Sequence, residues 1–218
     1  MWIPWTIARG RGLLASRPVI RLVTTAYWLV LILWIVTLFS AASVAMNAFG
    51  TMKDLTISAP DTAGLPPDHS TGRYLAGFIA DPAFRNYERW SLLLAPAMTA
   101  LLFAQRRLLG WPTAGWMNRI RVASLVVAIA LALVHLIGFA PGMARDLAAY
   151  REAVATGDAA VAAERYASFD AGHAWADRIL RFQGFALVLA AVTSAWVLTP
   201  RRTPQRGLMA APGFVGMR

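Results

Sequence analysis

Four long apolar runs, near residues 22–49, 90–109, 122–143 and 179–199, divide the sequence into five polar pieces. A bilayer core of about 30 Å is crossed by roughly 20 apolar residues in helical form. Backbone groups cannot stay unpaired in hydrocarbon, so each run must be a helix. The pattern predicts an all-α integral membrane protein: a four-helix bundle whose transmembrane domain covers residues 22–200.

The second run is the weakest of the four. Only 16 residues, from Trp90 to Gln105, precede the pair Arg106 and Arg107, and Pro96 lies inside the run and is expected to kink it. The run is long enough for a bilayer only when the two arginines extend their side chains to the headgroups.

The third and fourth runs differ in how they should end and pack. The third is expected to stop at Pro141–Gly142, because proline and glycine disfavour continued helix. The fourth contains the small residues Gly184, Ala191 and Ser194. Small side chains let another helix approach closely in a membrane, so this face is expected to be a packing face.

Basic and acidic residues segregate between the polar pieces. The first, third and fifth pieces contain twelve arginines and no Asp or Glu, whereas the second and fourth contain all eleven acidic residues. The twelve are Arg9, Arg11, Arg17, Arg21, Arg106, Arg107, Arg119, Arg121, Arg201, Arg202, Arg206 and Arg218. Arg-rich segments stay on the cytoplasmic side. The pattern predicts a multi-pass protein of the bacterial inner (plasma) membrane with both termini cytoplasmic.

The polar pieces themselves are expected to differ in structure. Residues 50–89 are rich in Pro, Gly and Asp, which is typical of an irregular outer loop, with short helices inside it as the alternative. Residues 144–178 are rich in Ala, with Arg and acid mixed, so this loop should be helical in part and turn or run into the fourth span. Only Gly157 and Gly172 interrupt its helical pattern. Residues 1–21 should lie in the cytoplasmic interface, and residues 201–218 should form a disordered tail.

Composition and processing signals narrow the class further. The chain is 58% apolar and 15% charged. Its net charge of +10 divides into +12 on three short segments, where it can meet anionic headgroups rather than nucleic acid, and −2 on the two outer pieces. The absence of cysteine excludes disulfides and thiolate metal sites. A cleaved signal peptide is the alternative for residues 1–45, but the apolar stretch greatly exceeds the usual 7–15 residues.

A candidate metal site lies at the outer end of the fourth run. Asp170, His173 and Asp177 have spacings that place them on one face of a helix. One imidazole and two carboxylates could hold a divalent metal. The alternative is a solvated helix end with local ion pairs, such as Asp177 with Arg181 at i, i+4.

His135 is the candidate cofactor-binding residue. It lies about eight residues inside the third run, and an ionisable side chain at that depth is a functional candidate. A neutral imidazole hydrogen-bonded to a neighbouring helix is the alternative. A haem b held by His135 and His173 would need both residues at one depth. A rise of 1.5 Å per residue places His135 roughly 12 Å below the outer end of its run, whereas His173 is expected above the outer end of the fourth run.

One short motif carries a family resemblance. The stretch 168–173, Ser-Phe-Asp-Ala-Gly-His, followed by Arg-Ile-Leu at 178–180, resembles the segment before the last span in small four-span membrane proteins grouped with the transmembrane protein 205 domain. Trp34 and Phe39 are similar to positions of that family's first span. The resemblance implies a four-helix membrane fold and leaves the activity open. The residues that it carries over are Phe169, Asp170 and His173.

Three classes of function are compatible with the sequence. The leading one is a non-catalytic accessory or scaffold subunit of a larger membrane assembly, because few polar groups lie within the apolar runs. A small transporter or permeation module is the second, and a haem- or metal-dependent membrane oxidoreductase is the third. The expected partners are the lipid bilayer with its anionic headgroups, other membrane subunits or a second copy, and no nucleic acid.

Overall fold

The computed structural model describes residues 17–52, 64–66, 70–108 and 115–198, and within these residues all regular structure is helical. The helices are α1 (Arg17–Met52), α2 (Thr71–Leu108), α3 (Trp116–Leu133), the π-helix η2 (Val134–Phe139), α4 (Ala140–Thr156) and α5 (Ala159–Leu198). Three helices are long and apolar enough to cross a membrane: Pro18–Met52, Trp116–Thr156 and Ala159–Leu198. The protein is therefore all-helical with the character of a membrane protein, as predicted.

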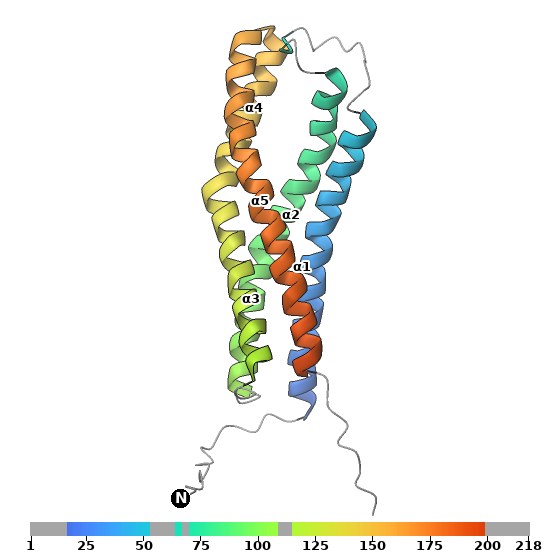
Figure 1. The fold of residues 1–218 in the computed structure, drawn as a ribbon, viewed down its shortest axis with the longest axis vertical. Helices are drawn as coiled ribbons and strands as arrows, with labels where there is room; N and C mark the ends of the chain where they lie inside the picture. Colours follow the sequence, from blue (N-terminus) through green and yellow to red (C-terminus); the bar gives the residue numbers. More distant parts are fainter. Residues whose placement is uncertain (1–16, 53–63, 67–69, 109–114, 199–218) are drawn as a thin grey trace, which may run out of the picture.

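The helices form antiparallel rods, with α3, η2 and α4 making one continuous rod (Figure 1). α1 packs mainly against α2, and α5 packs against α3 and α4, while α2 approaches α3 only sparsely. The first residues of α1 and α3 and the last residues of α2 and α5 all lie at the lower end of the bundle in Figure 1. This arrangement brings described arginines from α1, α2 and α3 to one end of the bundle.

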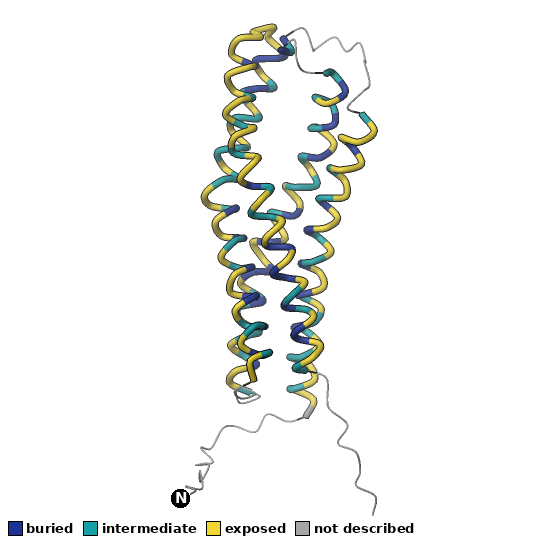
Figure 2. Tube along the Cα trace, in the orientation of Figure 1, coloured by how far each residue is buried: buried dark blue, intermediate teal, exposed yellow. Residues whose placement is uncertain are grey.

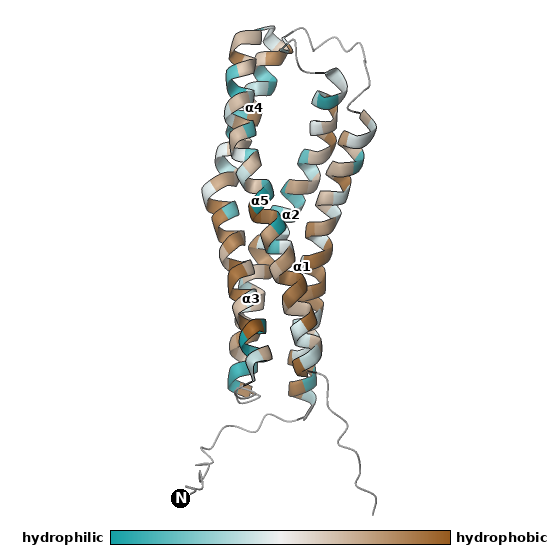
Figure 3. Ribbon diagram, viewed as in Figure 1, coloured by the Kyte–Doolittle hydropathy of each residue, from teal (hydrophilic) through white to brown (hydrophobic). Residues whose placement is uncertain are grey.

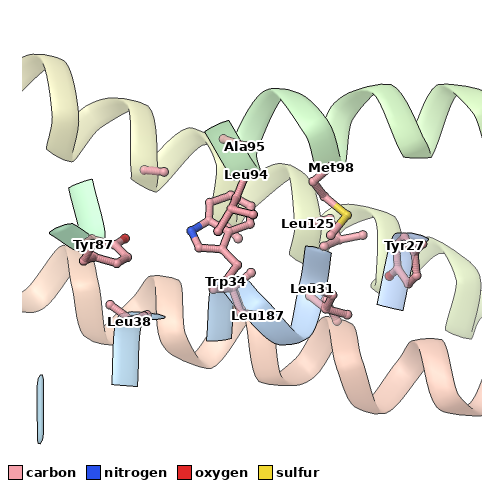
Figure 4. Packing of buried hydrophobic residues seen from close by; sticks show 14 of the residues in the cluster. Tyr27, Leu31, Trp34, Leu38, Tyr87, Leu94, Ala95, Met98, Leu125 and Leu187 are labelled. Carbon is pink, nitrogen blue, oxygen red and sulfur yellow. The ribbon is translucent and has the colours of Figure 1, made fainter. Parts of the chain in front are cut away.

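The bundle buries a narrow stripe of side chains along its interior and exposes large apolar side chains on its outside. In α1, the buried side chains Tyr27, Leu31, Trp34, Leu38 and Ala41 recur every three or four residues, which is the spacing of one helical face. Figure 4 shows Trp34 among Leu94, Leu125 and Leu187 from the neighbouring helices. Large apolar residues stay on the outside of every rod, where exposed segments and brown, hydrophobic segments coincide over much of the lower half (Figures 2 and 3).

The small residues of the fourth run contact α1, as expected. A Cβ added at Gly184 would lie 3.4 Å from Leu38 Cδ2, an ordinary van der Waals contact, so this face of α5 lies against α1. Ser194 is buried, and its Oγ is hydrogen-bonded to the Tyr27 hydroxyl at 2.5 Å.

The first outer loop was predicted wrongly in part. Residues 71–89 belong to α2, which begins at Thr71 rather than near residue 90 and contains both Pro82 and Pro96. Small buried residues at Gly72, Ala76 and Ala80 form a packing face along this half of the helix. That packing stabilises helix despite the low helix propensity of glycine and proline. α2 is not among the three helices that are long and apolar enough to cross a membrane.

The third run continues past Pro141–Gly142, contrary to expectation. The Ala140 N–H bonds to the His135 carbonyl, five residues earlier, as in a π-helix. Proline normally clashes with the carbonyl four residues before it and lacks a donor N–H. The π-helical turn that ends at Phe139 replaces the tighter α-helical hydrogen bonding just before Pro141. Pro141 is therefore accommodated, and the rod stays continuous into α4.

The second outer piece is helical, as predicted, and turns only once. Gly157 ends α4 with φ of 80°, a left-handed conformation suited to glycine. The Asp158 carboxylate then accepts from the Val161 N–H at 3.1 Å and caps α5. Gly172 does not interrupt α5, contrary to expectation. Most of the predicted interfacial segment 1–21 and the whole tail 201–218 lie outside the described residues.

Candidate functional site

The strongest candidate site lies where α2 meets the π-helix. His135 Nε2 is 3.3 Å from Glu88 Oε1. The His135 side chain is only 4% exposed, whereas Glu88 is 28% exposed. His135 Nδ1 is buried and has no hydrogen-bond partner within the described structure. Ionisable groups in this position can bind or pass a proton, and π-helical turns are frequent at functional sites.

Tyr87 extends this pair toward α5. Its ring centroid lies 6.4 Å from that of His135, and its hydroxyl donates to Gln183 Oε1 at 2.6 Å. One turn further along α2, Ser91 accepts from Trp34 Nε1 of α1 at 3.2 Å. Together, six polar or aromatic side chains form one cluster in the middle of the bundle: Trp34, Tyr87, Glu88, Ser91, His135 and Gln183.

A second polar group lies near the lower end of the bundle. The Arg121 guanidinium of α3 donates to Gln105 Oε1 of α2 at 2.9 Å and to Asn118 Oδ1 at 3.1 Å. It also lies over the Tyr27 ring, 5.4 Å from the centroid. Arg121 is only 3% exposed, so it is a buried link between helices and not simply one of the headgroup-facing arginines that the charge pattern indicated.

A third group joins α2 to α4 near the upper end. Arg151 donates to Asp81 Oδ2 at 3.0 Å and to the Gly77 carbonyl at 3.3 Å, and Arg85 donates to both oxygens of Asp81. Arg151 also lies over the Phe78 ring at 4.1 Å. Burial raises the pKa of Asp81, but the bonds from the two arginines outweigh it and hold that pKa below its ordinary value.

The predicted metal residues share α5 but form no closed site. Asp170 and His173 are exposed and Asp177 is half-buried. Asp177 pairs with Arg181 at 2.8 Å, as the ion-pair alternative expected, and His173 stacks on Phe169 with centroids 5.5 Å apart. Within the described ranges, no group of three His, Asp or Glu side chains could hold a metal ion.

The haem hypothesis gains no geometric support from the two histidines. His135 is buried and engaged with Glu88, while His173 is exposed and engaged with Phe169.

Sequence reasoning identified His135 by its depth but missed Glu88 and Tyr87, because both lay in a segment taken for a loop. One signal could have found them: the small residues Ala76 and Ala80 and then Tyr87 and Ser91 follow a helical period into the second run.

Comparisons with known protein families, with characterised proteins and with solved structures find no match to this chain.

Proposed function

We propose that the chain spans the membrane four times, with α2 as a span in addition to the three apolar helices, and that both termini are cytoplasmic. α2 runs alongside the three apolar helices and ends at the exposed residues Arg106 and Arg107, at the same end of the bundle as the start of α1 (Figure 1). Its central part exposes Leu92, Leu93 and Phe103, which suits contact with lipid.

Reporter fusions test this topology directly. Fusions at Gly110 and at the C-terminus should report a cytoplasmic location, and a fusion at Gly157 should report a periplasmic one. A periplasmic C-terminus would contradict the proposal.

We further propose that the protein is a non-catalytic accessory or scaffold subunit of a larger membrane assembly. The observation that carries this is the use of the buried polar side chains, which link one helix to another. Tyr87 bonds Gln183, Trp34 bonds Ser91, and Tyr27 bonds Ser194. Such bonds hold helices together in a membrane. The outward faces are apolar, notably along α5 at Phe182, Phe185, Val192 and Trp196.

Purification in mild detergent, followed by photocrosslinking in native membranes, tests this function. The purified protein should be colourless and free of stoichiometric metal; a Soret band or bound metal would instead support the oxidoreductase class. A photoreactive residue at Phe185 should give one discrete protein adduct. The matched control is Leu29 on α1, another exposed apolar position. Adducts with lipid alone at both positions would contradict a subunit role.

A small transporter is the second candidate, favoured by the Glu88–His135 pair. A partly exposed carboxylate bonded to a buried imidazole is an arrangement that can accept a proton from the surface and pass it inward. Proteoliposomes loaded with a pH-sensitive dye test this. A proton flux that is lost in both Glu88→Gln and His135→Gln, with folding intact, would replace the scaffold proposal.

The resemblance to the transmembrane protein 205 group stays a proposal. Its carried-over residues Phe169 and His173 stack on each other in α5, and Asp170 stays exposed beside them. This arrangement is compatible with a surface motif before the last span and does not assign an activity.

A further inference from the structure

A groove of about 340 Å³ lies between α2 and the η2–α4 junction. Its lining combines the charged residues Arg85 and Arg89 with the apolar residues Leu92, Leu136 and Pro141. Glu88 also lines it and connects it to His135. Along α2 the groove therefore has a charged end, its entrance, and an apolar end about one helical turn further on, at Leu92.

The charges at the entrance sum to a positive site. The three arginines Arg85, Arg89 and Arg151 outnumber the two carboxylates. Arg85 and Arg151 both pair with Asp81, and the Glu88 carboxylate is 3.3 Å from the His135 imidazole. Arg89 is exposed, and among the described residues it has no hydrogen-bond or ion-pair partner. A buried anion would be repelled by Glu88, but an anion at the entrance meets Arg89 first. The unmatched guanidinium favours a phosphate, which accepts paired N–H donors.

The position of the groove along the bundle matches a lipid better than a soluble anion. Arg89 directly precedes the apolar run of α2, and Pro141 lies near the outer end of the third run. In the proposed topology this is the level of the outer headgroups. Leu92 and Leu136 then lie toward the hydrocarbon core, where an acyl chain would run. The apolar end of the groove contributes contacts that inorganic phosphate cannot use.

We infer that this groove binds one anionic phospholipid of the outer leaflet, with its phosphate at Arg85 and Arg89 and an acyl chain against Leu92 and Leu136. The inference uses the proposed topology and is independent of the scaffold function. Near a membrane surface each basic residue contributes about 1 kcal/mol to binding of anionic lipid. Loss of Arg89 should therefore weaken the selection about five-fold.

The test uses the full chain in vesicles of equal parts phosphatidylglycerol and phosphatidylcholine. A photoreactive residue replaces Leu92 in the groove or, as control, Ile137, which is 74% exposed and outside the groove lining. Mass spectrometry gives the ratio of the two lipid adducts. We expect a ratio about five-fold higher at Leu92 than at Ile137.

Two variants in the groove and one control variant outside it test the site. In the Leu92-labelled protein, Arg89→Gln should lower the ratio to the Ile137 value, whereas Arg73→Gln, an exposed arginine of the same helix, should leave it unchanged. Ala144→Phe, at an exposed lining position, should reduce all adducts by filling the groove. Equal ratios at the two labels, equal effects of the two arginine variants, or no lipid adduct at Leu92 would each overturn the inference. Loss of the preference on adding inorganic phosphate would assign the site to free phosphate. Failure of these arms leaves the scaffold proposal standing, because that proposal depends on the Phe185 adduct.

Discussion

Removing one hydroxyl group from each of two buried tyrosines should have unequal effects on stability. Tyr87→Phe removes the donor to Gln183 Oε1, and Gln183 Nε2 already has no partner in the described structure. The whole buried amide is then unpaired, which costs about 1–3 kcal/mol. Tyr27→Phe removes the bond to Ser194, but Ser194 still donates to the Ala190 carbonyl. Tyr27→Phe should therefore lower the unfolding free energy by about 0.6 kcal/mol, the average for interhelical hydrogen bonds in membranes.

A double variant separates the unpaired amide from other effects of losing the hydroxyl. Gln183→Met keeps the length of the side chain and removes both amide atoms. Replacing both partners of a buried hydrogen bond by apolar groups can be nearly neutral. Tyr87→Phe combined with Gln183→Met should therefore be more stable than Tyr87→Phe alone, by about 1 kcal/mol.

Reversible unfolding in mixed micelles measures these free energies. The chain contains no cysteine, so a pair of introduced cysteines on α1 and α5 can carry a donor and an acceptor dye that report separation of the helices. Equal losses in Tyr87→Phe and Tyr27→Phe, or a double variant no more stable than Tyr87→Phe, would refute the assignment of the cost to Gln183.

Three further predictions concern the periphery. A Cβ at Gly64 would lie 2.7 Å from the Val154 carbonyl oxygen, so Gly64→Ala should lower the unfolding free energy by about 1–3 kcal/mol in the same assay. Because the pKa of Asp81 is lowered in the fold, the stability contributed by its carboxylate is complete above the unfolded pKa of about 3.9 and is lost as pH falls through the folded pKa. The Tm of the wild type should therefore exceed that of Asp81→Asn by a constant amount from pH 8 to 5, and the difference should shrink below about pH 4. A chelator should leave the Tm of both the wild type and His173→Ala unchanged, since no metal-binding group of three side chains is present in the described ranges; a chelator-dependent difference would restore the metal hypothesis.

The apolar runs predicted the helices well wherever one face meets lipid and charges are absent. α1 and the apolar part of α5 follow directly, because nearly continuous apolar sequence in a membrane protein has one stable form. The upper half of α2 could not be predicted in this way. Pro82 and several charges suggest a loop there, and the helix depends on packing of Ala76 and Ala80 and on the bonds of Asp81 to the arginines. Tertiary contacts outweigh local propensity in this segment.

Only one member of the candidate site, His135, could be predicted from the sequence. Depth within an apolar run singles out His135, because that position is costly for an ionisable group. Its partner Glu88 comes from another helix, and a helical period shows which face is buried without showing which neighbour meets it. The three acidic and imidazole groups of α5 show the converse: their shared face was predicted from spacing, but Asp177 is taken up by Arg181.

The polar contacts of α2 explain how the two helix pairs keep their alignment. α1 with α2, and α5 with α3 and α4, have extensive apolar contact, whereas α2 approaches α3 sparsely. Four polar links hold α2 to the second pair: Asp81–Arg151, Glu88–His135, Tyr87–Gln183 and Gln105–Arg121. They occur at three levels along α2, because Tyr87 and Glu88 are adjacent, so sliding α2 by a single turn would break all four at once. Apolar packing in lipid gives little preference between such registers. The buried polar residues of this chain therefore act first as a register for the bundle. The exception is the Glu88–His135 link. The Glu88 carboxylate lines the groove, so this link is where a role in binding or proton transfer is best tested.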